Sequence, residues 1–453
     1  MISKSRRSFL KKTAFSVGGM SIASSALSYS RIIGANERIN VAMTGVRSRG
    51  KRLIETIIGM KDTNIAIICD VASDILNARI EEVSKTQKKS KPIGEKDFRK
   101  VVENKDIDAV FISSPDHTHT PFAIMAMQGD KHVYVEKPLS HNPKEGELLI
   151  AAQKKYGKVV QVGNQQRSAP TSIQAVKDIG EGIIGDVYSA KCWYAAKRGS
   201  IGTGKTVPAP DWLDWDLWQG PAPRRPYQDN YVHYNWHWFW HWGTGEVNNN
   251  GLHELDVCRW ALGVGHPIKV FSTGGRFFFD DDWEFYDTQT VTYEYEDNKT
   301  ITWEGHSCNG LRQYERGRGI IIYGTKGSIL LDRNAYYAYD TKRETIKEMK
   351  ETETAPKGTE TAPSKTTGLV GAVPLNTYHM NNFFGAIRFG DQLNSAVDDV
   401  NKSNLMCHLG NIAQKLDTPL TIDNRTGRII GNDFAMQMWG REYEPGWEPK
   451  VGI

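Results

Sequence analysis

The sequence predicts an α/β protein with a doubly wound parallel sheet at the N-terminus. A C-terminal α+β domain follows, built on a large, mostly antiparallel open sheet. Between residues 38 and 163, short apolar runs alternate with helical segments, as in strand–helix–strand units. After residue 187, longer alternating strands follow one another with hairpin-type turns between them. We therefore expect one domain over residues 37–163 and a second over 164–453, with helices after about residue 375 packing back on the core.

The parallel sheet is predicted from five apolar runs rich in β-branched residues, at 39–44, 65–69, 108–113, 132–135 and 159–162. Helical periodicity lies between them at 51–60, 97–103, 121–129 and 144–156. Each run ends in polar residues. Open α/β sheets bind their ligands at the carboxyl ends of the strands, so we expect the functional residues there.

The second domain begins with a predicted helix at 171–178. Its strands are expected at 187–194, 268–273, 289–294, 300–304, 319–323 and 328–331. Residues 340–370 are rich in Lys, Glu, Thr and Pro and are interpreted as an exposed loop or insertion. Helical periodicity returns after residue 378.

Composition restricts the class of protein. The formal net charge is +4 over 453 residues, and no basic block beyond the N-terminus points to nucleic acid. Five scattered cysteines without CxxC spacing argue against a disulfide framework and a cysteine zinc site.

The N-terminus has the layout of a twin-arginine export signal, which we place at residues 1–36. Arg6 and Arg7 precede Phe9, Leu10 and a small-residue apolar segment at 13–27. That segment is too short and too rich in Gly and Ser to span a membrane, and we expect no span in the mature chain. The prediction is a periplasmic or secreted protein, exported folded with its cofactor. A basic disordered tail is the alternative.

A glycine loop follows the first predicted strand. It has the outline of a dinucleotide-binding turn, with Gly45 and Gly50 at its ends but Arg47 at the middle glycine position. Asp70 ends the second strand, about 20 residues later, where a carboxylate accepts ribose hydroxyls and repels a 2′-phosphate. This favours NAD over NADP, although Asp70 could instead be a helix N-cap. The expected cofactor residues here are Gly45, Arg47, Ser48, Arg49 and Asp70.

Residues 235–260 hold an unusual aromatic and histidine cluster. Trp236, Trp238, Trp240 and Trp242 alternate, so a strand would place them on one face suited to a sugar ring. His237 and His241 have i, i+4 spacing, but no other metal signature accompanies them, and we predict no metal. We assign Trp236, His237, Trp238 and His241 to the substrate. A Trp-rich core corner is the alternative.

The same stretch continues into a predicted helix that carries His253 and Asp256 at i, i+3, on one face. Unperturbed histidine titrates near pH 6.5, so His253 is a candidate base, with a backbone-bonded core histidine as the alternative. Lys137, beside Glu136 at a strand end, could have a lowered pKa and relay the proton. Asp256 is assigned to the substrate.

Three of these features resemble one family. Glu136-Lys137-Pro138, the glycine loop with Asp70, and Gly-Leu-His253-Glu-Leu-Asp256 together resemble the Gfo/Idh/MocA oxidoreductases, in a branch that carries twin-arginine signals. The resemblance implies an N-terminal Rossmann domain that holds NAD(P), and an α+β domain whose open sheet often mediates dimers or tetramers. It implies a carbohydrate substrate and a homo-oligomer.

The resemblance also assigns roles by position. Lys137 would contact the nicotinamide ribose and the reacting hydroxyl, His253 would accept the proton, and Asp70 would hold the adenosine ribose. Asn249 stands where many members have an aspartate, so it could orient a hydroxyl but could not share a proton. Further cofactor contacts would come from Ser114, Pro115, His119, Glu136 and Asn164, with Arg167 beside the substrate.

Three functions remain open. The first is an NAD(P)-dependent oxidoreductase acting on a secondary alcohol of a sugar, polyol or glycoside, with a tightly bound cofactor. The second is an NAD-dependent glycosidase that oxidises, eliminates, hydrates and reduces back. The third is a catalytically decayed sugar-binding protein, suggested by Arg47 and Asn249.

Overall fold

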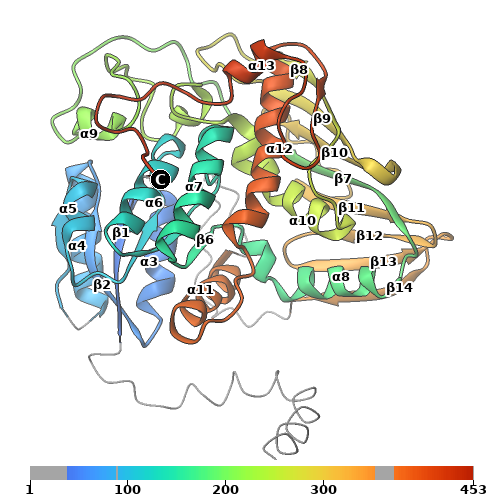
Figure 1. Ribbon diagram of the computed structural model, residues 1–453, viewed down its shortest axis with the longest axis horizontal. Helices are drawn as coiled ribbons and strands as arrows, with labels where there is room; N and C mark the ends of the chain where they lie inside the picture. Colours follow the sequence, from blue (N-terminus) through green and yellow to red (C-terminus); the bar gives the residue numbers. More distant parts are fainter. Residues whose placement is uncertain (1–37, 88–89, 352–371, 452–453) are drawn as a thin grey trace, which may run out of the picture. The chain divides into compact units, whose positions relative to one another are not determined.

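The strands of the computed structural model form one sheet of six strands and one of nine, within the residues described (Figure 1). Those residues are 38–87, 90–351 and 372–451. The predicted export signal lies outside them. No helix in the described part of the chain is long and apolar enough to cross a membrane.

The first sheet has the strand order β3-β2-β1-β4-β5-β6. Strands β1 and β4, and strands β4 and β5, pair in parallel, with Val41 of β1 opposite Ala109 of β4 and Ile112 of β4 opposite Val135 of β5. This confirms the predicted doubly wound sheet. Its strands are β1 (Ile39–Thr44), β2 (Thr63–Cys69), β3 (Ile93–Glu95), β4 (Ala109–Ile112), β5 (His132–Val135) and β6 (Val160–Val162).

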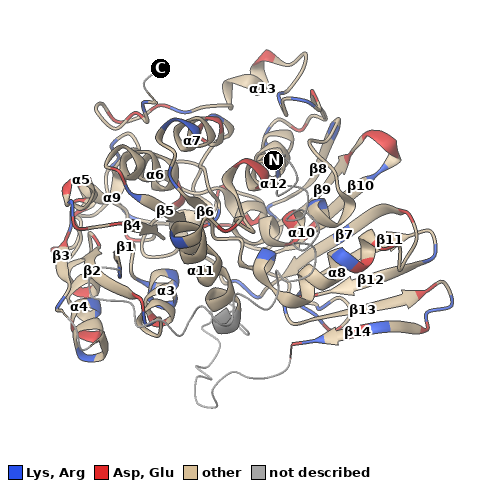
Figure 2. Cartoon of the chain, turned by 60° about the horizontal axis from the view of Figure 1, so that its bottom comes forward, with Lys and Arg blue, Asp and Glu red and all other residues tan. Residues whose placement is uncertain are grey.

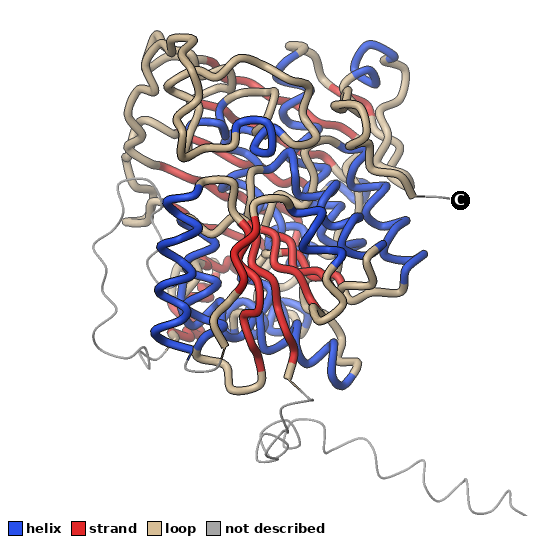
Figure 3. The backbone as a smooth tube through the Cα atoms, turned by 90° about the vertical axis from the view of Figure 1, so that its left-hand side faces the viewer, coloured by secondary structure: helices blue, strands red, loops and turns tan. Residues whose placement is uncertain are grey.

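Helices lie on both sides of these strands (Figure 3). Helix α3 buries Leu53, Ile54 and Ile57, which recur at helical spacing. Helix α7 begins at Pro143 after the cap Asn142 and ends before Gly157, the usual terminal signals. The helices of this part are α3 (Ser48–Ile58), α4 (Ser73–Gln87), α5 (Phe98–Glu103), α6 (His119–Gln128) and α7 (Pro143–Tyr156).

The strand order reverses beside β1. The chain moves outward from β1 to β3 and returns on the other side of β1 as β4. The connections after β1 and β4 therefore diverge, and they leave a crevice at the carboxyl ends of these strands. This is the position where the sequence predicts the functional residues.

The second sheet has the order β14-β13-β12-β11-β7-β10-β9-β8-β15. Only β7 and β10 pair in parallel among its described strands. The predicted, mostly antiparallel sheet is thus confirmed. Its strands are β7 (Val187–Ala195), β8 (Lys269–Gly275), β9 (Thr288–Glu294), β10 (Thr300–His306), β11 (Arg318–Gly324), β12 (Gly327–Leu331), β13 (Ala335–Asp340), β14 (Thr345–Lys350) and β15 (Leu420–Thr421).

One face of this sheet is covered by helices. Helix α10 (Leu252–Leu262) packs against β7 and β11, and α12 (Val397–Lys415) packs against β8 and β9. Alternate residues of β9 and β10 are buried, the pattern of a sheet with one covered face. Helix α8 (Pro170–Gly180) lies on β12 and β13, and α11 (Ala372–Phe389) packs against α3. Shorter helices are α9 (Trp215–Gln219) and α13 (Asp433–Gln437).

Three local features differ from the predictions. Strand β3 was not predicted, because a run of three residues carries no periodicity. Strand β14 falls inside the predicted loop at 340–370; its charged, exposed side chains suit an edge strand (Figure 2). Residues 352–371 of that loop lie outside the described residues. The alternating tryptophans form no strand, since Asn235–Trp238 is a 3₁₀ turn.

Candidate active site

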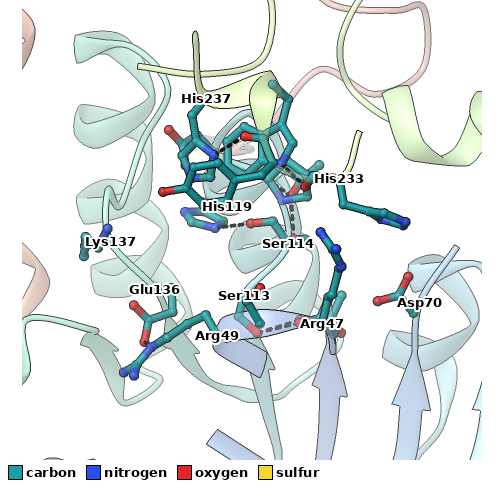
Figure 4. Close-up of a pocket in the computed structure, with 18 of the residues that line it drawn as sticks. Arg47, Arg49, Asp70, Ser113, Ser114, His119, Glu136, Lys137, His233 and His237 are labelled. Atoms are coloured by element: carbon teal, nitrogen blue, oxygen red, sulfur yellow. Dashed lines mark hydrogen bonds and ion pairs between the residues drawn. The ribbon is translucent and has the colours of Figure 1, made fainter. Parts of the chain in front are cut away.

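One large cavity opens at the carboxyl ends of β1, β2, β4 and β5 (Figure 4). Residues from the range 233–253, which follows the parallel sheet in the chain, line the other side of the cavity. Most of the predicted site residues meet there, although they lie far apart in the sequence. Those that line the cavity are Gly45, Arg47, Ser48, Arg49, Asp70, Ser114, Pro115, His119, Glu136, Lys137, Trp236, His237, Asn249 and His253.

The glycine loop brings backbone close to backbone. Gly45 has φ +73°, and a Cβ there would lie 2.5 Å from the backbone nitrogen of Ser114. A Cβ on Gly50 would lie 2.0 Å from the Gly45 carbonyl oxygen, so neither position accepts a side chain. No side chain caps the first turn of α3, and no acid lies in it. Free N–H groups at a helix N-terminus attract phosphate, so this turn fits the diphosphate of a dinucleotide.

The two loop arginines behave differently. Arg49 donates to Oε1 of Glu136 at 2.7 Å and to Oδ1 of Asn376 at 2.9 Å, so its guanidinium is already held. Glu136 is buried and also accepts from Nε2 of Gln165 at 3.0 Å. Arg47 is exposed, and its side chain has no hydrogen bond or ion pair within the described chain. Arg47 is therefore the loop arginine that can meet an anion.

Asp70 lies at the end of β2. Its Oδ2 accepts from the backbone N–H of Val46 at 2.8 Å, and its Oδ1 accepts from that of Ala72 at 3.0 Å. Burial raises the pKa of this carboxyl group. An ionised carboxylate has about four acceptor positions. Two remain after these bonds, enough for a pair of ribose hydroxyls.

Lys137 reaches from the end of β5 to Asn249. Its Nζ donates to the Asn249 carbonyl oxygen at 2.5 Å and lies 3.3 Å from Oδ1 of the same residue. Asn249 belongs to η6, a π-helical turn over Val247–Gly251, a distortion that often marks functional sites. Burial lowers the pKa of Lys137 to about 8, against the opposing effect of Glu136 and Asp116. Lys137 can therefore exchange a proton near neutral pH.

His253 lies in the first turn of α10, buried at the cavity wall. Burial lowers its pKa well below the ordinary value, and Arg333, Lys137 and Arg318 lower it further. This direction runs against the expectation that His253 titrates near neutrality, and its assignment as the base stays a prediction. The imidazole is neutral at neutral pH, so it can donate or accept a hydrogen bond but is a weak base.

Several cavity residues were not predicted. Asp116 follows β4 and accepts from Oγ1 of Thr244 at 2.6 Å; its place in the polar run after a predicted strand could have pointed to it. Arg318 and Arg333 come from β11 and from the turn after β12. No local motif marks these arginines, because only the sheet brings them to the cavity.

Arg167 and Asp256 do not reach the cavity lining. They form a buried bidentate ion pair, with Nε to Oδ2 at 2.7 Å and Nη2 to Oδ1 at 2.8 Å. Asp399 and Ser403 complete the network at 2.9 Å from Arg167 and 2.7 Å from Asp256. Arg167 lowers the pKa of Asp256 to about 2, against burial. Their partners are all internal, so these residues join η4 (Gln165–Ser168) to α10 and α12.

Three further predicted residues also lie outside the lining. Trp238 stacks on Trp283 with ring centroids 3.9 Å apart, and Nε2 of His241 lies 2.7 Å from the Pro223 carbonyl oxygen. Asn164 is buried at the end of β6. The four alternating tryptophans therefore do not form the single sugar-binding face that a strand would give. Of these four, only Trp236 reaches the cavity, beside His237 at a centroid distance of 3.6 Å.

No group of three or more His, Cys, Asp or Glu side chains within the described residues could hold a metal ion. His237 and His241, the pair with metal-like spacing, are directed to different backbone carbonyls, those of Tyr234 and Pro223.

The chain is similar to several named proteins over part of its length. It is 25% identical over 253 residues to a glycosyl hydrolase family 109 protein of Saccharopolyspora erythraea, covering 50% of this chain and 55% of that one. It is 25% identical to an alpha-N-acetylgalactosaminidase of Shewanella oneidensis over 35% of each chain. A levoglucosan dehydrogenase of Pseudarthrobacter phenanthrenivorans is 35% identical over 39% of each. The matches thus span about half or less of these relatives.

Solved structures share the fold. A levoglucosan dehydrogenase in complex with NADH and levoglucosan has a TM-score of 0.63 at 18% identity, over 85% of this chain and 99% of that one. An aldose–aldose oxidoreductase of Caulobacter crescentus has a TM-score of 0.62 at 16% identity, over 85% and 100%.

Two models of one family match consecutive parts of the chain. Residues 39–164 match the oxidoreductase family's NAD-binding Rossmann fold, and residues 189–353 match the family's C-terminal alpha/beta domain. The matched parts contain the glycine loop, Asp70, Lys137 and His253. The chain therefore belongs to the Gfo/Idh/MocA family of oxidoreductases.

Proposed function

We propose that this protein oxidises a secondary hydroxyl of a sugar, polyol or glycoside, with tightly bound NAD as the hydride acceptor. The observation that carries the proposal is the shared cavity: the glycine loop and Asp70 line it together with Lys137, Asn249 and His253. The residues proposed to bind the nucleotide and the residues proposed to move the proton thus line the same cavity. The similarity to a levoglucosan dehydrogenase supports a carbohydrate substrate.

NAD, rather than NADP, fits the ribose end. The uncapped turn of α3 would hold the diphosphate, and Asp70 would accept hydrogen bonds from the adenosine ribose. A 2′-phosphate beside the Asp70 carboxylate would be repelled. Arg47 is a feature that would favour that phosphate, and the charges that act on it are those of Asp70 and Asp74.

Lys137 is proposed as the group that takes the hydroxyl proton. Its lowered pKa leaves part of it neutral near pH 7, and the Asn249 carbonyl holds its Nζ in place. His253, neutral in the cavity wall, would hydrogen-bond the same hydroxyl and orient it. Asn249 offers an amide for a neighbouring hydroxyl. The roles suggested by the resemblance are thus exchanged, with Lys137 as the base.

The test is direct. The purified protein is examined for bound nicotinamide by absorbance and fluorescence, then mixed with sugars, polyols and glycosides. Formation of reduced nicotinamide together with a keto sugar supports the proposal. If no nicotinamide nucleotide binds, the oxidoreductase proposal is wrong and a sugar-binding protein is left.

A second candidate is an NAD-dependent glycosidase. The relatives named glycosyl hydrolase family 109 and alpha-N-acetylgalactosaminidase favour it. Its first step is the same oxidation, followed by elimination of the aglycone, addition of water and reduction. Aryl alcohol released from an aryl glycoside without net reduced nicotinamide would favour this function over the dehydrogenase.

We also propose export through the twin-arginine route to the periplasm or outside the cell, because Arg6 and Arg7 form the arginine pair of such a signal. A fusion of residues 1–40 to a reporter tests it: replacing both arginines by lysine should abolish export. We further propose a homo-oligomer, which light scattering of the purified protein would test.

A further inference from the structure

Arg333 is an unpaired cation in the cavity wall. It lies in the turn between β12 and β13, which is closed by the backbone bond from Asp332 to Ala335 at 2.9 Å. The adjacent carboxylate of Asp332 is already taken, since it accepts from Nε of Arg316 at 2.7 Å. In the described part of the chain, Arg333 has no hydrogen bond or ion pair.

The other cations around the acid–base group are compensated. Arg49 pairs with Glu136 at 2.7 Å, and Arg318 forms a bidentate pair with Glu254 at 2.7 and 2.8 Å. Lys137 donates to a carbonyl and needs no counter-ion when neutral. Arg333 therefore adds a charge that forms no ion pair with a carboxylate in the described part of the chain.

This charge belongs to the substrate end of the cavity. After burial, Arg333 is the first group that lowers the pKa of His253. Arg333 lines the same cavity as Lys137 and His253, and the charges of Arg318, Glu254 and Arg49 act on it. Cofactor phosphates are expected at the turn of α3.

A half-buried guanidinium without an anion is unfavourable. Burial and the like charge of Arg318 together lower the pKa of Arg333 to about 9. A ligand carboxylate would remove this penalty, and it matches the planar fork of a guanidinium in two parallel hydrogen bonds.

We propose that Arg333 is a carboxylate-binding subsite, and that the preferred substrate is a uronic acid or uronide rather than a neutral sugar. The proposal rests on the proposed oxidoreductase function and narrows its substrate. The carboxylate would lie in the same cavity as the hydroxyl that meets Lys137 and His253. It would also offset the positive field around His253.

Matched substrates test it. Methyl glucuronide and methyl galacturonide differ from the corresponding glucoside and galactoside only at the sixth carbon. The wild-type protein should have a kcat/KM about 10-fold or more higher for the uronides than for the glycosides. This ratio corresponds to the free energy of one hydrogen bond to a charged group. A preference for the neutral glycosides, or for sugar phosphates over uronides, would overturn the proposal.

Substitutions assign the preference to one residue. R333Q should reduce the uronide-to-glycoside ratio of kcat/KM by about 10-fold to 100-fold, and R333K should keep part of it. R343Q, in the exposed turn between β13 and β14, is the matched control and should leave the ratio as in the wild type. If R333Q leaves the ratio intact, or if R343Q lowers it equally, the subsite is not at Arg333.

Two measurements distinguish failure of the proposed oxidoreductase function from failure of the proposed carboxylate subsite at Arg333. Absence of NADH binding, measured by fluorescence titration, would remove the oxidoreductase function alone. In that case glucuronate should still raise the Tm of the wild type and of R343Q, but not that of R333Q. No rise in any of the three proteins, with NADH bound or not, contradicts the subsite.

Discussion

The Nζ atom of Lys137 lies 2.5 Å from the backbone carbonyl oxygen of Asn249. This bond joins the end of β5 in the parallel sheet to the π-helical turn before α10. It holds a half-buried ammonium group at the meeting point of the two sheets' loops, in the cavity that His253 also lines. The acid–base group of the proposed reaction is thus fixed by backbone, not by a carboxylate.

Replacing Lys137 by Ala should remove the proton acceptor. We expect kcat to fall by about 100-fold to 10,000-fold, the usual contribution of general base catalysis, with nicotinamide binding retained. Steady-state kinetics and fluorescence titration of NADH measure the two effects. Lys144→Ala, on the exposed surface of α7, is the control. Equal kcat in both variants would show that Lys137 is not the base.

The pH dependence follows from Lys137. A base with a pKa of about 8 accepts a proton only when neutral, so kcat/KM for oxidation should rise with pH through about 8 and level off above it. For reduction of the keto product the protonated form is needed, and the rate should fall over the same range. His253, neutral throughout, should add no inflection near pH 6.5. An inflection there would return the role of base to His253.

His253→Ala should impair catalysis without affecting the cofactor. The loss of one hydrogen bond to the reacting hydroxyl is expected to lower kcat by about 10-fold to 1,000-fold. NAD content after purification should equal that of the wild type. Full activity in this variant would mean that His253 is only a core residue.

Asp70→Ala should weaken NAD binding. Two ribose hydrogen bonds to a carboxylate are lost, and we expect Kd for NADH to rise by about 10-fold or more. Discrimination against NADPH should decrease, because the repulsion of a 2′-phosphate is gone and Arg47 remains. Parallel titrations with NADH and NADPH measure both. Unchanged affinities would indicate that Asp70 serves only to bind the backbone of Val46 and Ala72.

Asp256→Asn tests a structural role. Removing one charge leaves the buried Arg167 partly uncompensated, and we expect a loss of about 3 kcal/mol in the free energy of unfolding. The folded-state pKa of Asp256 is lowered to about 2 from 3.8, so its stabilising effect is present above pH 3.8. It is lost as pH falls toward 2. Denaturant unfolding at pH 7 and near pH 2 should show a difference between wild type and variant only at the higher pH. A variant of wild-type stability with a raised KM would instead favour the substrate role.

The parts of the fold that the sequence predicts are those encoded locally. Apolar runs followed by polar residues identified the parallel strands, and Gly45, Gly50 and Asp70 marked the nucleotide end because they belong to one strand–helix–strand unit and the residue that follows it. Strand β14 was missed, because this edge strand is exposed and charged and so lacks the apolar periodicity of a strand.

The parts that could not be predicted depend on contacts between distant segments. The alternation of tryptophans suggested a strand. In the structure Trp238 stacks on Trp283 and Trp240 stacks on Phe285, and local periodicity cannot indicate contacts between segments so far apart in the sequence. Arg167 and Asp256, 89 residues apart, satisfy each other. Arg333 reaches the cavity only through the register of β12 and β13. Charge pairing of this kind is a property of the folded chain.

A single-turnover experiment tests the central claim most directly. The protein is loaded with NAD, freed of excess nucleotide and mixed with the uronides and glycosides, while the near-ultraviolet absorbance of reduced nicotinamide is followed. We predict that it appears with at least one of these sugars in the wild type, transiently or stably, and fails to appear in Lys137→Ala with the same NAD content. No reduction of bound NAD by any of them, or equal reduction in the variant, would contradict the account.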